Sequence, residues 1–136
     1  MAFVLDSSVA LAWLLPDEGS EEVDKLADRL EAETALVPAV WRLEVGNALL
    51  TALRRERLAR KDVDRLLALV AALPVEQDLP LDDAAYSRVM AIAERFALTS
   101  YDAAYLELAQ RRGVALATLD ARLRQTCARA GVAVMP

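Results

Sequence analysis

The sequence contains no histidine and only one cysteine, Cys127. A serine–histidine–aspartate triad and a zinc site with histidine ligands are therefore excluded, and no disulfide can form within the chain. The four glycines are scattered, so the chain has neither a GxxxxGKS/T phosphate loop nor a GxGxxG dinucleotide turn. These absences exclude several common nucleophilic, zinc-dependent and nucleotide-binding chemistries.

Positive charge is also scarce, because the formal net charge is −5 and only Lys25 and Lys61 are lysines. This balance argues against a broad basic surface for bulk nucleic-acid binding. It leaves an RNA substrate possible, since metal ions and a local arginine patch can hold phosphates. The longest apolar runs, at residues 9–15 and 66–73, are shorter than the ~18 residues of a membrane span, and the chain begins without a basic segment. We therefore expect a soluble cytoplasmic protein.

Short apolar runs alternate with helical patterns along almost the whole chain of 136 residues. The runs predict five strands, at residues 2–5, 35–37, 75–77, 114–117 and 132–134. The helical periodicity predicts seven helices, at residues 9–15, 21–33, 39–56, 60–73, 82–96, 101–112 and 121–130. Strands joined by helical crossovers form parallel sheets. The predicted fold is a single α/β domain, with a five-stranded parallel sheet and helices on both faces.

Helix-boundary residues support these predicted elements. Ser7 and Ser8 are suited to cap the short helix over residues 9–15. Pro38 suits the first turn of the predicted helix at residues 39–56. Gly113 and Gly131 stand where helices should give way to strands. No linker or repeat is evident.

Four acidic residues have unusually apolar surroundings: Asp6, Glu44, Asp102 and Asp120. Asp6 follows the first predicted strand directly, and Asp120 follows the fourth by two residues. In open parallel sheets, binding sites gather at the carboxyl ends of the strands. Clustered carboxylates without histidine favour a hard divalent cation. The pattern therefore indicates a metal-dependent acidic site.

Each acid also has an ordinary explanation. Asp120 can cap the helix that follows it. Asp102 can complement a helix dipole or share a capping box with Thr99. Glu44 can lie on a solvated helix face. Asp6, at the end of a buried strand, is harder to explain in this way.

Four segments, in chain order, resemble the PIN domain, and most specifically the VapC-type toxins of toxin–antitoxin pairs. They are FVLDSSVA at residues 3–10, EVGNAL at 44–49, LTSYDAAY at 98–105 and LATLD at 116–120. The likeness extends from the first residues to the last predicted strand. It implies a PIN domain over residues 1–136.

The resemblance implies an endoribonuclease that depends on Mg²⁺ or Mn²⁺ and hydrolyses RNA phosphodiester bonds with a metal-activated water, leaving a 5′-phosphate and a 3′-hydroxyl. Asp6, Glu44, Asp102 and Asp120 match the acidic quartet of the family and are the expected catalytic and metal-binding residues. Asp6 and Asp102 would be direct ligands, and the other two would act through water or on a second ion. Residues expected to support them are Ser7, Ser8, Asn47 and Thr118.

The resemblance also implies partners: an RNA substrate, a small cognate antitoxin and a second copy of the chain. Residues 13–15 and the helix at 39–53 offer apolar surface for such contacts. An alternative is a non-catalytic PIN-like module whose acidic pocket holds a structural ion or a partner's arginine. A phosphatase or receiver-type domain is disfavoured, because neither Lys25 nor Lys61 is placed late in the sheet.

Overall fold

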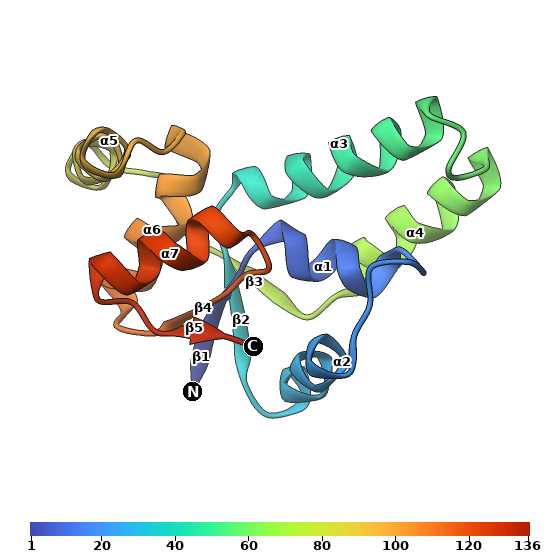
Figure 1. Ribbon diagram of the computed structural model, residues 1–136, viewed down its shortest axis with the longest axis horizontal. Coiled ribbons are helices and arrows are strands. Elements are labelled where there is room, and N and C mark those ends of the chain that lie inside the picture. The colour runs from blue at the N-terminus through green and yellow to red at the C-terminus, as the bar shows by residue number, and fades with distance from the viewer.

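A five-stranded parallel sheet forms the centre of the molecule, which is described over residues 1–136 by a computed structural model (Figure 1). All four neighbouring strand pairs are parallel, and the strand order is β3-β2-β1-β4-β5. The strands are β1 (Ala2–Leu5), β2 (Thr34–Val37), β3 (Val75–Gln77), β4 (Ala115–Ala117) and β5 (Val134–Met135). The central strands are buried on both faces, as their continuous apolar runs predict.

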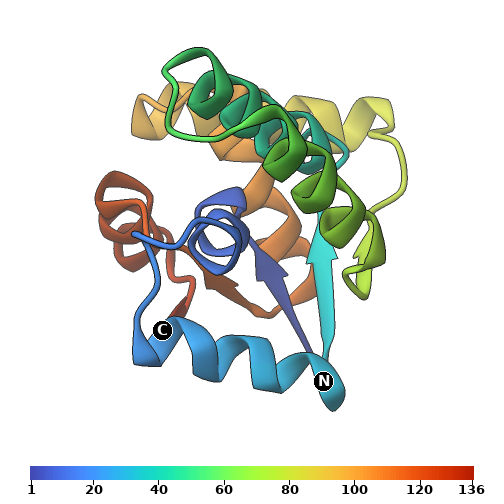
Figure 2. The ribbon, with the colours of Figure 1, turned by 90° about the vertical axis from the view of Figure 1, so that its right-hand side faces the viewer.

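Seven α-helices cover the two faces of the sheet. They are α1 (Ser7–Leu14), α2 (Glu21–Asp28), α3 (Val40–Arg54), α4 (Arg60–Ala72), α5 (Asp83–Phe96), α6 (Ser100–Arg112) and α7 (Ala121–Ala130). In Figure 1, α1, α2 and α4 lie on one side of the strands and α5, α6 and α7 on the other. Figure 2 shows α1 in front of the sheet, α2 along the bottom of the view, and α3 and α4 above the strands. The predicted α/β architecture is confirmed, and no helix is long and apolar enough to cross a membrane.

Several predicted boundaries are wrong by a few residues. Ser7 and Ser8 belong to α1 itself, and Asp6 takes the N-cap position without a side-chain capping bond. Pro38 precedes α3, which begins at Val40. The last strand starts later than predicted because Gly131 has a left-handed φ of 73° and the chain is still turning at Val132, whose N–H donates to the carbonyl of Cys127.

The turn between α5 and α6 is unusually tight. Ala97 ends α5 in a left-handed conformation (φ 54°), which a residue with a Cβ adopts at a cost of about 1–2 kcal/mol. The Leu98 N–H then donates to the carbonyl of Ala93, and Thr99 caps α6. This turn determines where α6 begins and therefore where Asp102, in its first turn, lies.

The apolar core lies along the central strands, around Phe3, Val4, Leu36 and Leu116. The prediction that residues 13–15 offer free apolar surface is largely wrong. Leu15 is buried, and the Trp13 indole N–H donates to the Val23 carbonyl at 2.7 Å. These side chains hold α1 against α2 and are not exposed for binding a partner.

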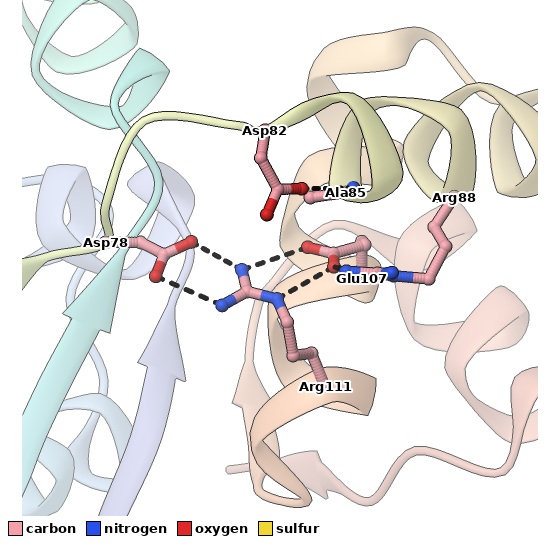
Figure 3. Close-up of polar contacts among 6 residues, drawn as sticks. All are labelled: Asp78, Asp82, Ala85, Arg88, Glu107 and Arg111. Carbon is pink, nitrogen blue, oxygen red and sulfur yellow. Dashed lines mark hydrogen bonds and ion pairs between the residues drawn. The ribbon is translucent and has the colours of Figure 1, made fainter.

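A cluster of ion pairs around the buried Glu107 joins α5, α6 and the segment after β3 (Figure 3). Glu107 on α6 is only 2 % exposed. Arg111 donates to it at 2.8 Å and Arg88 pairs with it at 3.2 Å. Arg111 also reaches Asp78, with a shortest contact of 2.5 Å. The guanidinium of Arg111 thereby ties α6 to the end of β3.

Candidate active site

The carboxyl ends of β1 and β4 meet where the strand order reverses. Leu5 is paired with Ala117, and the Asp6 N–H donates to the Ala117 carbonyl at 2.9 Å. The residues that follow the two strands therefore emerge side by side. This is the edge at which ligands bind in open α/β sheets.

Asp6 is a buried carboxylate held by hydroxyl groups. Its side chain is 5 % exposed, and its Oδ2 accepts hydrogen bonds from Ser8 at 2.6 Å and from Thr118 at 2.7 Å. No side-chain hydrogen bond reaches its Oδ1, and the backbone N–H of Ser7 also lowers the pKa of Asp6. Burial raises the pKa of Asp6, the two hydroxyls oppose that rise, and the charge of Asp120 adds to it. One oxygen is thus fixed and the other is available.

Glu44 enters the site from α3. The hydroxyl of Tyr105, on α6, donates to Glu44 Oε1 at 2.5 Å. Burial raises the pKa of Glu44, the Tyr105 hydrogen bond opposes the rise, and the charges of Asp6 and Asp102 increase it. Hydrogen bonding by Ser7 also lowers the pKa of Glu44. The half-buried Glu44 therefore lies within electrostatic reach of two of the other acids.

Asp102 lies in the first turn of α6. Its backbone N–H donates to the Thr99 hydroxyl at 3.1 Å, which is one half of the predicted capping box. The other half is missing, because the Asp102 carboxylate has no hydrogen bond within the protein. Burial raises the pKa of Asp102, as do the charges of Asp6 and Asp120, whereas Arg122 lowers it. Asp102 is therefore a half-buried acid with both oxygens free.

Asp120 combines a structural role with a place at the site. Its Oδ1 accepts the Leu123 N–H at 2.9 Å, so it caps α7 as the ordinary explanation predicts. Its charge also raises the pKa values of Asp6 and Asp102. Capping uses one oxygen and leaves the other for a ligand.

The four acids share two electrostatic properties. Their charges couple to one another, and none of them forms an ion pair with lysine or arginine. No three of them are close enough to form a ready-made coordination sphere. This loose, oxygen-only, negatively charged set fits Mg²⁺ or Mn²⁺, because Mg²⁺ keeps several waters and takes one or two carboxylates directly.

The supporting residues divide into two groups. Ser8 and Thr118 touch Asp6, and Ser7 affects Glu44. Asn47 is exposed on α3 and has no hydrogen bond to any of the acids, so its role stays a prediction. Sequence reasoning missed Tyr105, although its spacing of three residues from Asp102 puts both on one face of a helix.

The sequence profile of the PIN domain family matches residues 3–129. The chain is a PIN domain protein. It is 30 % identical over 133 residues to ribonuclease VapC3 of Pyrobaculum aerophilum, across 92 % of this chain and 94 % of that protein. It is 33 % identical over 123 residues to ribonuclease VapC9 of Mycobacterium tuberculosis, across 90 % of this chain and 89 % of the relative. These relatives confirm the resemblance to VapC-type PIN domains.

Solved structures show the same PIN fold. The Pyrobaculum aerophilum protein PAE2754 superposes with a TM-score of 0.71 at 25 % identity, over 98 % of this chain and 83 % of that one. The FitAcB structure from Neisseria gonorrhoeae has a TM-score of 0.66 at 19 % identity, over 98 % and 96 % of the two chains. VapBC2 of Rickettsia felis, solved with a promoter DNA fragment, has a TM-score of 0.67 at 11 % identity, over 98 % and 97 %. The last two support the fold of this PIN domain alone.

Proposed function

We propose that this PIN domain is a Mg²⁺- or Mn²⁺-dependent endoribonuclease and the toxin of a toxin–antitoxin pair. One observation carries the proposal: four carboxylates without a cationic partner gather at the carboxyl edge of the sheet. The names of its relatives, which are VapC ribonucleases, support the choice of RNA as substrate.

The oxygens that the protein leaves free define the proposed ligand roles. Asp6 Oδ1 and the Asp102 carboxylate are the direct ligands, and Glu44 and Asp120 act through water. Ser8 and Thr118 keep Asp6 in place, so that its free oxygen stays turned away from the hydroxyls. When bound, the ion activates a water and stabilises negative charge on the phosphate.

Proton transfer must rely on carboxylates, because the chain has no histidine. Burial raises the pKa values of Asp6, Glu44 and Asp102, with mutual repulsion adding to the effect. Cleavage should therefore strengthen as pH rises through these raised values, since ion binding needs the charged forms.

The proposed partners follow from charge and exposed apolar surface. An arginine of the antitoxin fits the negative pocket in forked geometry. A second copy of the chain would cover the apolar residues Leu79, Tyr86 and Met90, which are exposed at the start and along one side of α5. Because the proposed substrate is cellular RNA, we place the protein in the cytoplasm. Sedimentation of wild type and Tyr86→Arg tests the homodimer, which the arginine should dissociate.

Cleavage of RNA in defined metal conditions tests the activity. Wild-type protein should cut RNA with Mg²⁺ or Mn²⁺, leave a 5′-phosphate and a 3′-hydroxyl, and stop when a chelator is added. Asp6→Asn should lose the activity, whereas Asp24→Asn, on the exposed face of α2, should keep it. Cleavage that survives the chelator or the Asp6 change would contradict the proposal.

The alternative, a non-catalytic binding module, makes a different prediction for the same samples. The pocket would bind Mn²⁺ or a partner's arginine, but no RNA would be cut under any metal condition. Calorimetry with Mn²⁺ beside the cleavage assay separates the two functions.

A further inference from the structure

Tyr105 differs from the other tyrosines of the chain. The side chains of Tyr86 and Tyr101 are 56 % and 59 % exposed, whereas Tyr105 is fully buried at 0 %. Its hydroxyl donates a hydrogen bond to Glu44 Oε1 at 2.5 Å, and hydrogen bonding by the Ser7 side chain also acts on it. A buried hydroxyl without a partner costs about 1–3 kcal/mol, so this contact determines how both side chains lie.

The hydrogen bond links α3 and α6, the two helices that carry Glu44 and Asp102, two of the four site acids. Tyr105 lies on α6 three residues after Asp102, and Glu44 lies on α3. The α6 helix also packs directly on β1 and β4, so its backbone is fixed relative to Asp6 and Asp120. Through Tyr105, the rigid α6 helix sets the position of a carboxylate that belongs to another helix.

Glu44 gains more from such a restraint than the three aspartates do, because its side chain is longer. Asp6 is held by two hydroxyls, and Asp120 is held by the N–H of Leu123. Glu44 has one more rotatable bond than an aspartate, and ordering a flexible glutamate side chain costs about 1–2 kcal/mol of conformational entropy. The hydrogen bond from Tyr105 occupies Oε1 and leaves Oε2 for an ion or its water.

We propose that Tyr105 is a positioning residue that orients Glu44 for metal binding. This inference rests on the metal-dependent function proposed above, and it adds a residue that does not itself contact the ion. The hydroxyl restrains Glu44 before the ion binds, so less side-chain conformational entropy is lost on binding. Groups that orient metal ligands in this way typically change metal affinity by about 10–100-fold when they are removed.

The test measures Mn²⁺ affinity by calorimetry, without RNA. Tyr105→Phe removes only the hydroxyl and should weaken Mn²⁺ binding by about tenfold. Tyr101→Phe removes an exposed hydroxyl on the same helix, beside Asp102, and should leave the affinity unchanged. Glu44→Asp keeps the charge but shortens the side chain, so it should break the same hydrogen bond and give a comparable loss.

A double-mutant cycle separates positioning from packing. If Tyr105 acts through Glu44, Tyr105→Phe should cause no further loss of Mn²⁺ affinity in a Glu44→Ala background. An equal loss in both backgrounds would show a merely structural role and overturn the inference. Wild-type affinity in folded Tyr105→Phe, or no Mn²⁺ binding by the wild type, would overturn it too. Tight, Tyr105-dependent Mn²⁺ binding without RNA cleavage would contradict the proposed ribonuclease function and leave the positioning role supported.

Discussion

Asp6 and Glu107 are both buried carboxylates of this protein, but they differ in whether a cationic side chain lies beside them. Glu107 is 2 % exposed and lies between two guanidinium groups, at 2.8 Å from Arg111 and 3.2 Å from Arg88 (Figure 3). Asp6 is 5 % exposed and has only the hydroxyls of Ser8 and Thr118. The charge of Glu107 is therefore compensated by arginines, whereas the charge of Asp6 is oriented by hydroxyls but not compensated.

This difference separates a structural carboxylate from one that can serve a ligand. A guanidinium repays part of the cost of burying an acid and fixes it in a cross-link. Hydroxyl groups stabilise the anion less, so the protein keeps an electrostatic penalty that an arriving cation removes. A buried acid without a cationic partner is therefore the more informative sign of function.

The largest expected contrast is in RNA cleavage. Asp6→Asn keeps the shape of the side chain but removes the anionic ligand, so the rate should fall by more than about 100-fold, beyond the range of indirect effects. Glu107→Gln makes the same chemical change at the compensated site and should leave the rate nearly unchanged. Matched single-turnover assays compare the two. Similar losses in both variants would show that the two carboxylates do not differ in their importance for cleavage.

The second contrast is in folding stability. Arg111→Met removes the guanidinium and leaves Glu107 buried with Arg88 as its remaining partner, so the free energy of unfolding should fall by about 2–3 kcal/mol. Arg112→Met, at the next position and without an ion pair, should change it by less than about 0.5 kcal/mol. Urea unfolding measures both variants. Equal stability of the two would mean that the buried cluster contributes nothing specific.

A third contrast depends on pH and should be smaller. Because burial raises the pKa of Asp6 in the folded state, the contribution of this one group to stability is greatest at low pH and is lost as pH rises through the raised value. In chelator, Asp6→Asn should therefore be more stable than wild type at pH 7, and the difference should vanish below about pH 4, near the pKa of an unfolded aspartate. Unfolding curves across this range test it, with Asp24→Asn as the exposed control. A gain that persists unchanged in acid would point to packing instead of charge.

The smallest effect is stabilisation by the ion itself. At ten times the dissociation constant, Mn²⁺ should add about 1.4 kcal/mol to the stability of the wild type, which raises Tm by about 4 °C for a chain of this size. Glu107→Gln should show the same shift, and Asp6→Asn should show none. Thermal melts with and without Mn²⁺ provide the measurement. A shift in Asp6→Asn as large as in the wild type would place the ion elsewhere.

Local patterns predict most of the fold and the acids, for physical reasons. The apolar runs before Asp6 and Asp120 are continuous because strands buried on both faces need no polar alternation, and these runs locate the sheet edge. Asp120 was explained equally well as a cap or as a site residue, and it proves to cap α7 while its charge acts on Asp6.

The features that sequence reasoning missed depend on long-range contacts. Nothing local distinguishes Glu107 from a solvated glutamate, since its partner Arg88 lies on α5 and its other partner, Arg111, is held by Asp78 after β3. Tyr105 could equally be an ordinary core aromatic until Glu44 is placed beside it, 61 positions away. Local periodicity cannot supply contacts that only the assembled fold creates.

The hydrogen bond between Thr118 and Asp6 spans 112 positions of the chain, and it has a consequence for the order of events during synthesis. Asp6 is translated well before β4, which pairs with β1 and brings Thr118 and Asp120 to it. At a translation rate of about 5–20 residues per second, several seconds separate the two ends. A nascent chain can form its β1–β2 pair early, but the acidic edge stays incomplete until β4 has emerged and paired with β1. Until then Asp6 has neither the Thr118 hydroxyl nor Asp120 beside it, so the candidate site cannot form during the earlier part of synthesis.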